Sequence, residues 1–313
     1  KLHLRHRHKR GDSCNSFART TKFWVRLPNW LGDVVMTLPL LDAIHRGRPD
    51  ASITVVGKKD FESILKPLPY IEHFKPIPKG SFFKRFYDLR EYSKEYPSLI
   101  INFANSLRSD LECFLIGPPR RYGLTFSGRI RPLLTHSFNY EKKRNGRPNE
   151  IHQVEMWESF LKFFGLNKEL DLSPIKTSTE RNPNKLGILP GSANNPAKRW
   201  PIHKWKKLVE LLLNKNKSIN IFIYGAFQES ELANQISGDF DNSRVINLCG
   251  KTSLSELAEE LASCAKVVGN DSGGMHLANA VGCPSAVLFG PTNPKVTAPC
   301  FNVPLKIIQA KKT

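Results

Sequence analysis

A short apolar segment, a polar loop and a helix-like segment follow one another repeatedly along most of this chain. The unit is first seen as KFWVRL, PNWLGD and VVMTLPLLDAIHRG, the last with apolar residues at helical spacing. It returns in the second half, for example as AKVV, NDSGG and MHLANAVG. Strands that alternate with helices favour a parallel sheet with right-handed crossovers. The alternation therefore predicts an α/β fold.

The alternation is interrupted once, near residues 168–185, where the sequence is rich in Pro, Ser, Thr and Asn and lacks periodicity. A chain of 313 residues is also too long for one ordinary core. We therefore expect two Rossmann-like, doubly wound domains, residues 23–172 and 173–313, which face each other across a cleft. Because ligands of such sheets bind at the carboxyl ends of the strands, the strand-to-helix loops are where chemistry is expected.

The first 22 residues are basic, lack apolar periodicity and predict a flexible, solvated arm. This stretch has no apolar core of the kind that a secretory signal needs, and no apolar run is long enough for a membrane span. The six cysteines form no CxxC pair and no Cys/His cluster, so they favour buried thiols over a zinc site or a disulfide framework. We expect a cytoplasmic protein.

The loop NDSGGMH follows an apolar strand and leads into a helix. Backbone amides at a helix start, with glycines that allow close approach, suit a diphosphate, and Ser272, Gly273 and Gly274 supply both. Asp271 would repel a phosphate and suits a sugar hydroxyl; His276 belongs to the same candidate site. The alternative is a capped helix preceded by a tight turn.

A second loop, LPGSANNPAKRWP, also follows an apolar strand. Ser192 and Asn194 are candidate donors of hydrogen bonds, and Lys198 is a compact cation for a phosphate. The alternative is an ordinary loop with a surface lysine. Neither GxxxxGK[ST] nor GxGxxG is present, which disfavours ATP hydrolysis and hydride transfer.

Two further loops carry carboxylates. In YGAFQESE, Glu229 or Glu231 lies near a glycine turn, where an acidic side chain can hold ribose hydroxyls, although helix starts also favour Glu. In LPNWLGDVVM, Asp33 lies between Gly32 and a helix, either as an N-cap or as a general base. A carboxylate at the mouth of a strand can take the proton of an attacking hydroxyl group.

Four segments, taken in order, resemble the bacterial lipopolysaccharide heptosyltransferases of glycosyltransferase family 9, especially the heptosyltransferase II type. They are LPNWLGDVVMTLPLL, NSLRSD, LPGSANNPAKRWP and NDSGGMHLANAVGCPSAVLFGPTNP. The resemblance spans residues 22–296 and implies a GT-B fold with an amino-terminal acceptor domain and a carboxyl-terminal donor domain. It further implies transfer of L-glycero-D-manno-heptose from ADP-heptose to the inner core of lipopolysaccharide, with inversion, as the second heptose.

The resemblance also implies roles for single residues. The catalytic Asp of the family falls on Asp33, its phosphate-binding Lys on Lys198, its ribose-binding Glu on Glu229, and its donor-binding Asp-Ser/Thr-Gly segment on residues 271–273. No DxD-type motif lies near the donor loops, so no obligatory metal or other cofactor is expected. The chain ends at LKIIQAKKT, where family members continue into a further helix, and we expect that helix to be lacking.

Net charge of +19 favours anionic partners. Arginines gather in the first half at positions 108, 120, 121, 129 and 131, ahead of EKKRNGR. Arg makes bidentate bonds to carboxylates and phosphates, so the candidate acceptor-binding residues are Asn105, Arg108, Arg120 and Arg121. The alternatives are a solvated basic face or contact with anionic lipid of the inner membrane. We expect a monomer.

Two other functions remain open. The first is a glycosyltransferase of the same fold that uses another nucleotide sugar or acceptor. The second is a nucleic-acid-binding protein, suggested by the net charge and the HRHKR arm. No helix-turn-helix, zinc-finger spacing or RNP-like strand supports the second, and an epimerase would need a nicotinamide fingerprint that PNWLGD does not supply.

Overall fold

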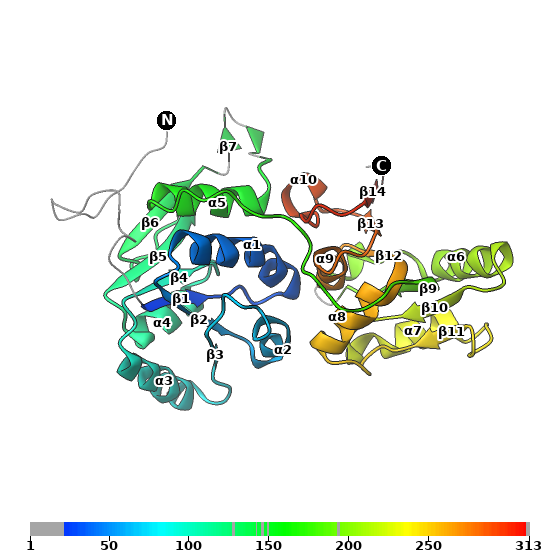
Figure 1. Ribbon diagram of the computed structural model, residues 1–313, viewed down its shortest axis with the longest axis horizontal. Helices are drawn as coiled ribbons and strands as arrows, with labels where there is room; N and C mark the ends of the chain where they lie inside the picture. Colours follow the sequence, from blue (N-terminus) through cyan, green and yellow to red (C-terminus); the bar gives the residue numbers. More distant parts are fainter. Residues whose placement is uncertain are drawn as a thin grey trace. The chain divides into compact units, whose positions relative to one another are not determined.

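The computed structural model describes residues 22–126, 129–141, 143–144, 147–148, 150–192 and 195–310. The basic arm and Asn194 thus lie outside the described residues. Close contacts divide the chain into two compact units, unit 1 from Lys1 to Asp171 and unit 2 from Leu172 to Thr313 (Figure 1).

Unit 1 is built on a six-stranded parallel sheet with the strand order β3-β2-β1-β4-β5-β6. The strands are β1 (Lys22–Arg26), β2 (Ser52–Gly57), β3 (His73–Pro76), β4 (Leu99–Asn102), β5 (Arg120–Phe126) and β6 (His136–Tyr140). The helices are α1 (Leu31–Gly47), α2 (Glu62–Leu65), α3 (Phe82–Glu91), α4 (Leu107–Ile116) and α5 (Gln153–Phe163). Helix α1 packs with α5, and α3 packs with α4, so two helix pairs cover the sheet (Figure 1). A two-stranded antiparallel ribbon, β7 (Lys143–Arg144) and β8 (Arg147–Pro148), precedes α5.

Unit 2 repeats this winding, with the strand order β11-β10-β9-β12-β13-β14 and every described pair parallel. The strands are β9 (Asn182–Leu189), β10 (Asn220–Ile223), β11 (Val245–Asn247), β12 (Cys264–Asn270), β13 (Ser285–Phe289) and β14 (Leu305–Gln309). The helices are α6 (Ile202–Lys215), α7 (Ser230–Ser237), α8 (Leu254–Ser263), α9 (Gly273–Ala280) and α10 (Pro294–Thr297). The expected α/β fold of two doubly wound parallel sheets is confirmed.

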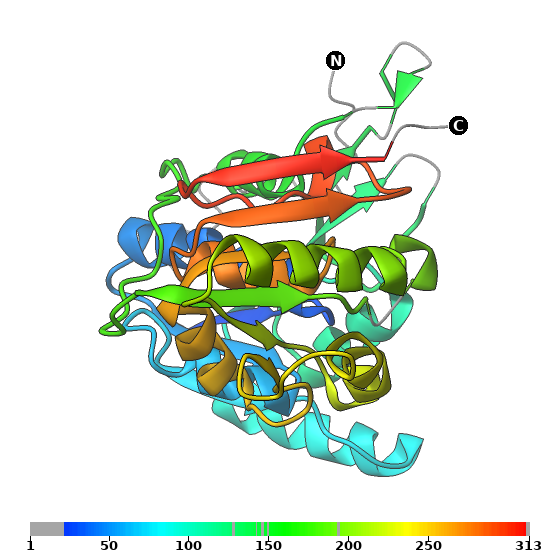
Figure 2. The same cartoon turned by 90° about the vertical axis from the view of Figure 1, so that its right-hand side faces the viewer.

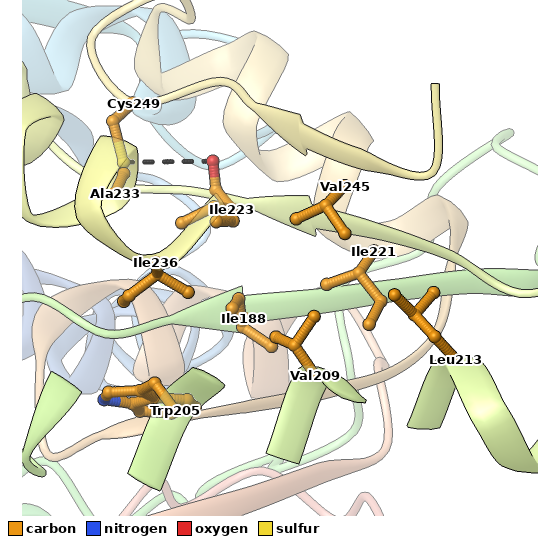
Figure 3. Packing of buried hydrophobic residues seen from close by; sticks show 10 residues of the cluster. All are labelled: Ile188, Trp205, Val209, Leu213, Ile221, Ile223, Ala233, Ile236, Val245 and Cys249. Atoms are coloured by element: carbon orange, nitrogen blue, oxygen red, sulfur yellow. Dashed lines mark hydrogen bonds between the residues drawn. The ribbon is translucent and has the colours of Figure 1, made fainter. Parts of the chain in front are cut away.

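The core of unit 2 shows why α6 forms where it does. Trp205, Val209 and Leu213 recur every four residues and are the buried side chains of this helix. They pack on Ile188 of β9 and on Ile221 of β10 (Figure 3), and α6 lies alongside these strands (Figure 2). Ile202, Leu208 and Leu212 are partly buried against the same core, whereas six of the other positions of α6 are Lys, Glu or Asn, so one side of the helix favours burial.

Two element boundaries differ from the sequence expectation. Strand β9 begins at Asn182, inside the segment 168–185 that lacked periodicity, because Asn182 pairs with Cys264 of β12. Helix α4 begins inside NSLRSD, where Ser106 and Ser109 form reciprocal capping hydrogen bonds. In both places a tertiary or capping contact extends an element beyond its apolar part. No helix among the described residues is long and apolar enough to cross a bilayer.

Candidate active site

The order of strands reverses between β9 and β12 in unit 2. In open α/β sheets this switch point, at the carboxyl ends of the strands, is where ligands bind. Residues 190–201 follow β9, and residues 271–272 follow β12 and lead into α9. The two strongest loops of the sequence therefore meet at one place.

Lys198 and Asp271 join the two loops directly. The Nζ atom of Lys198 donates to Oδ2 of Asp271 at 2.7 Å, and the hydroxyl of Thr292, which follows β13, donates to the same oxygen at 2.7 Å. The side chain of Asp271 is 6% exposed and that of Lys198 is 23% exposed. The carboxylate is thus enclosed, while the side chain of Lys198 stays partly exposed.

Asn270, at the end of β12, fixes the loop after β9. Its side chain is fully buried, donates to the carbonyl of Pro190 at 2.6 Å and accepts from the backbone N–H of Trp200 at 3.1 Å. One amide side chain thereby holds both ends of the segment that carries Lys198. The position of the cation is set by β12 and not only by its own loop.

NDSGGMH is interpreted either as a diphosphate-binding helix start or as a capped helix after a tight turn, and the start of α9 has features of both. Ser272 occupies the N-cap position with extended backbone, as the capped-helix alternative predicts. Its side chain, however, makes no capping hydrogen bond. A Cβ at Gly274 would collide with the side chain of Leu189. The packing of α9 on β9 is therefore by itself a reason for glycine at this position, whether or not a phosphate binds there. His276 lies in α9 and is buried.

Glu229 lies at the end of a short 3-10 helix, Phe227–Glu229, after β10. It is buried, and its Oε2 accepts from the backbone N–H of Ala226 at 2.9 Å. A Cβ at Gly191 would overlap the carboxylate of Glu229. Glu229 is therefore packed against the loop after β9, whereas Glu231 belongs to the first turn of α7 and accepts from Gln235 at 3.1 Å.

Ser192 is buried in the same loop, and its carbonyl accepts from the guanidinium of Arg199 at 3.2 Å. Asn195 accepts from the backbone N–H of Ala197 at 3.0 Å and so begins the 3-10 helix Pro196–Lys198. The described residues of unit 2 thus bring Lys198, Asp271 and Thr292 into contact, with Glu229 against Gly191.

Asp33 in unit 1 lies in the first turn of α1, which begins at Leu31 after the N-cap residue Trp30. The N-cap alternative for Asp33 is therefore wrong. Its Oδ1 accepts from Nε2 of Gln153, the first residue of α5, at 3.2 Å. The order of strands reverses between β1 and β4, so α1 starts at the switch point of this sheet.

A buried ion pair fixes the loop that leads to Asp33. Arg26, the last residue of β1, donates to Glu112 of α4 at 2.7 Å, with both side chains at most 3% exposed. The same guanidinium bonds the carbonyl of Leu27 and, at 2.9 Å, the side chain of Asn29. Arg85 and Arg108 also donate to Glu112, at 3.0 and 3.2 Å. Three arginines thus surround one carboxylate beside this loop.

The arginines expected to form one anion-binding site do not gather. Asn105 and Arg108 follow β4, at the carboxyl edge of the sheet. Arg120 and Arg121 begin β5 and pair with Leu99 and Ile100, which places them at the amino edge.

The remaining arginines of this group have other environments. Arg121 donates to the carbonyls of Pro118 and Leu133, both at 2.7 Å. Arg131 is buried and bonds Asp110, with Nε at 2.9 Å from Oδ2, whereas Arg129 is exposed. Both the expectation of one arginine cluster and the alternative of one solvated basic face are therefore wrong for this set.

Four of the five described cysteines are small buried side chains, as expected. Cys113, Cys249, Cys264 and Cys283 are buried and Cys300 is partly buried. Burial raises the pKa of the Cys113, Cys249 and Cys283 thiols to about 12. Among the described residues no cluster of three His, Cys, Asp or Glu side chains has the arrangement of a metal site.

Four residues that make contacts at these loops were not predicted from the sequence: Gln153, Gly191, Asn270 and Thr292. Thr292 carried a usable signal, because GPTNP follows the apolar strand SAVLFG at a neighbouring strand of the same sheet. No sequence signal pointed to Gln153. It follows a loop, whereas the predicted site residues directly follow strands of the sheet.

The chain matches the model of glycosyltransferase family 9 (heptosyltransferase) over residues 89–311. It is 28% identical to lipopolysaccharide heptosyltransferase 2 of Salmonella typhimurium, covering 87% of this chain and 83% of that protein. It is 30% identical to lipooligosaccharide heptosyltransferase 2 of Campylobacter jejuni, covering 92% and 86%.

Solved structures agree. The Escherichia coli ADP-heptose lipopolysaccharide heptosyltransferase II has a TM-score of 0.74 at 25% identity, covering 92% of this chain and 90% of that one. The E. coli heptosyltransferase WaaC with ADP has a TM-score of 0.73 at 21% identity, covering 92% and 93%, which bears on the fold alone. The expected GT-B class is confirmed. The family model spans well over half of the sequence, and the chain therefore belongs to glycosyltransferase family 9, the heptosyltransferases.

Proposed function

We propose that this glycosyltransferase moves L-glycero-D-manno-heptose from ADP-heptose to the inner core of lipopolysaccharide, as the second heptose and with inversion. Membership of family 9 and the heptosyltransferase 2 relatives support the donor and the acceptor class. The observation that carries the proposal is the Lys198–Asp271 pair at the switch point of unit 2. It offers a cation for a diphosphate beside a carboxylate for sugar hydroxyls.

We assign the donor site to unit 2. Lys198 stabilises the charge that grows on the diphosphate as its bond to the anomeric carbon breaks, and the backbone amides at the start of α9 add their partial charge. Asp271 accepts from a heptose hydroxyl, and Glu229 holds the ribose. Ser192, Asn194, Ser272, Gly273, Gly274 and His276 complete the proposed donor site.

We assign the base to Asp33 of unit 1. In a single displacement the acceptor hydroxyl attacks the anomeric carbon, its proton passes to the Asp33 carboxylate, and ADP leaves from the opposite face, which inverts the configuration. Gln153 is a positioning residue, because its amide donates to one oxygen of the Asp33 carboxylate at 3.2 Å and so orients it. Asn105 and Arg108, at the carboxyl edge of the same sheet, are the proposed acceptor contacts that remain compatible with this placement.

The decisive experiment combines ligand binding with product analysis. ADP-heptose is expected to raise the melting temperature, and mass spectrometry is expected to show one added heptose on a defined core that ends at the first heptose. Asp33→Asn should keep the thermal shift and lose transfer by about 10²- to 10⁴-fold. Asp42→Asn, on the same helix but in an exposed pair with Arg46, is the matched control.

A different nucleotide sugar is the second candidate, and the same assay tests it. A shift with another nucleoside diphosphate sugar and none with ADP-heptose at high concentration would overturn the choice of donor. A shift with DNA would instead support nucleic-acid binding. Monomeric state, cytoplasmic location and peripheral membrane contact stay predictions; light scattering, fractionation and vesicle binding, in that order, test them.

A further inference from the structure

Helix α3 presents three large aromatic side chains to solvent along one side. Phe83 is 82% exposed, Phe86 45% and Tyr87 67%. Positions 83, 86 and 87 are three and four residues apart, so they share one face of the helix. Leu89 is 2% exposed and belongs to the core of unit 1, together with Ile100 and Leu115. The helix is therefore anchored by one face and displays its aromatic side chains on another.

Basic residues flank this aromatic face. Lys79, Lys84 and Arg90 are exposed, and the segment 79–94 holds five Lys or Arg against two Asp or Glu. The described ion pairs in this segment use other cations, Arg85 with Glu112 and Lys94 with Glu91. The surface around the aromatic side chains is thus positive as well as apolar.

These two properties fit one kind of partner. Contiguous exposed apolar side chains mark interaction surfaces. An aromatic face bordered by Lys and Arg is the pattern of helices that lie in a membrane interface, where rings enter the headgroup region and cations meet lipid phosphates. An anionic leaflet carries a negative potential over its whole surface, so several separated cations gain from it together.

We propose that α3 docks unit 1 on an anionic bilayer. Phe83, Phe86 and Tyr87 enter the interface, and Lys79, Lys84 and Arg90 bind lipid phosphates. This docking extends the proposed function, because a lipid-linked acceptor is presented at such a surface, but it requires neither the donor site nor catalysis. Phe227 of unit 2 is also exposed, but its short 3-10 helix, Phe227–Glu229, holds no second aromatic residue and no Lys or Arg.

Vesicle co-sedimentation of the full chain, without donor, tests this docking. The chain is expected to bind vesicles of phosphatidylglycerol and phosphatidylcholine strongly and vesicles of phosphatidylcholine alone weakly, with release at high salt. Phe83→Ser/Tyr87→Ser and Lys84→Glu/Arg90→Glu should each lower the partition coefficient on the order of tenfold. Leu211→Ser, at a 55% exposed position of α6 in unit 2, should change nothing and is the matched control.

The outcomes separate cleanly. The docking proposal is overturned if the parent chain stays in the supernatant with anionic vesicles, or if both double variants sediment with them like the parent. A concentration-dependent dimer that Phe83→Ser/Tyr87→Ser abolishes, without vesicle binding, would assign α3 to a second copy of the chain instead. Parental melting temperatures of the variants without any ligand show that they fold, and this control keeps the result independent of the proposed activity.

Discussion

Lys198 and Asp271 are 73 residues apart in sequence, yet Nζ of the lysine lies 2.7 Å from Oδ2 of the aspartate. The cation that we assign to the donor diphosphate is therefore neutralised before any donor binds. A diphosphate has to compete with Asp271 for this ammonium group. Because Thr292 donates to the same carboxylate oxygen, the carboxylate keeps a hydrogen bond when the lysine turns toward a ligand.

Separate removal of the two charges should distinguish stability from binding. Lys198→Met leaves the nearly buried Asp271 carboxylate with the Thr292 hydrogen bond but without its cation. We expect a loss of about 1–3 kcal/mol in urea unfolding, less than for a fully buried pair because the lysine is partly exposed. Adding Asp271→Asn should recover much of this loss but not the thermal shift with ADP. Lys206→Met breaks an exposed pair with Asp239 and should cost at most about 0.5 kcal/mol. A full ADP shift in Lys198→Met would remove the lysine from the donor site.

Gln153→Ala should weaken catalysis without abolishing it. The amide orients the Asp33 carboxylate and does not receive the proton, so we expect kcat to fall about 10- to 100-fold, with the KM for ADP-heptose nearly constant. Gln153→Glu places a second carboxylate at this distance and should shift the lower limb of the pH–rate profile upward, because like charges raise the pKa of a base. If the pH profile of this variant matches that of the parent, the contact is only structural.

Gly191→Ala should disturb the proposed ribose site through a clash. The added methyl group occupies the position of the Glu229 carboxylate, so one of the two must move. We expect about 1–3 kcal/mol of destabilisation and a much smaller thermal shift with ADP. The double variant Gly191→Ala/Glu229→Ala should recover stability and not binding. Gly191→Ala with parental stability would show that the carboxylate has room to move.

The Arg26–Glu112 pair should contribute strongly to stability. Glu112→Ala leaves the buried guanidinium of Arg26 without its carboxylate, and we expect a loss of about 3–5 kcal/mol in chemical denaturation. Glu210→Ala, in an exposed pair with Lys207, should cost about 0–1 kcal/mol. Glu112→Gln should be intermediate, because the amide oxygen still accepts one bond. A loss below that of the exposed control would mean that water replaces the carboxylate.

The buried thiols predict how stability changes in alkali. Burial holds the pKa of Cys113 and Cys249 at about 12, above the ordinary thiol value of 9. Between these values the unfolded chain releases thiol protons that the folded chain keeps, so the free energy of unfolding falls as pH rises above about 9. Cys113→Ala/Cys249→Ala should flatten this decline. Mass spectrometry after iodoacetamide at pH 8 should show these two thiols unmodified in the folded chain, and their rapid alkylation would contradict the burial.

The doubly wound topology of both sheets and the loops that carry Asp33, Lys198 and Asp271 could be predicted from the sequence. In each case an apolar strand, a polar loop and a periodic helix stand in order, and the carboxyl end of a strand locates the loop. Partners remote in sequence could not be predicted in this way. That Arg131 is neutralised by Asp110 while Arg120 lies at the opposite edge of the sheet depends on packing, which spacing along the chain does not encode.

The extra residues of β9 illustrate the same limit. Asn182, Pro183 and Asn184 are poor strand formers, and nothing in NPN predicts extended pairing. Strand β12 supplies a pairing partner for Asn182 at Cys264, and β9 therefore includes these residues despite their composition. Propensity is overruled where a neighbouring strand is already in place.

The contact between Gly191 and Glu229 makes the residue allowed at each of these two positions depend on the residue at the other. A side chain at position 191 is tolerated only when position 229 vacates the space, and a lineage that loses this carboxylate is released from the need for glycine. Comparison of many relatives should therefore show the two positions changing jointly, with Gly and Glu retained or replaced as a pair. Such covariation would be visible without any measurement on the protein itself.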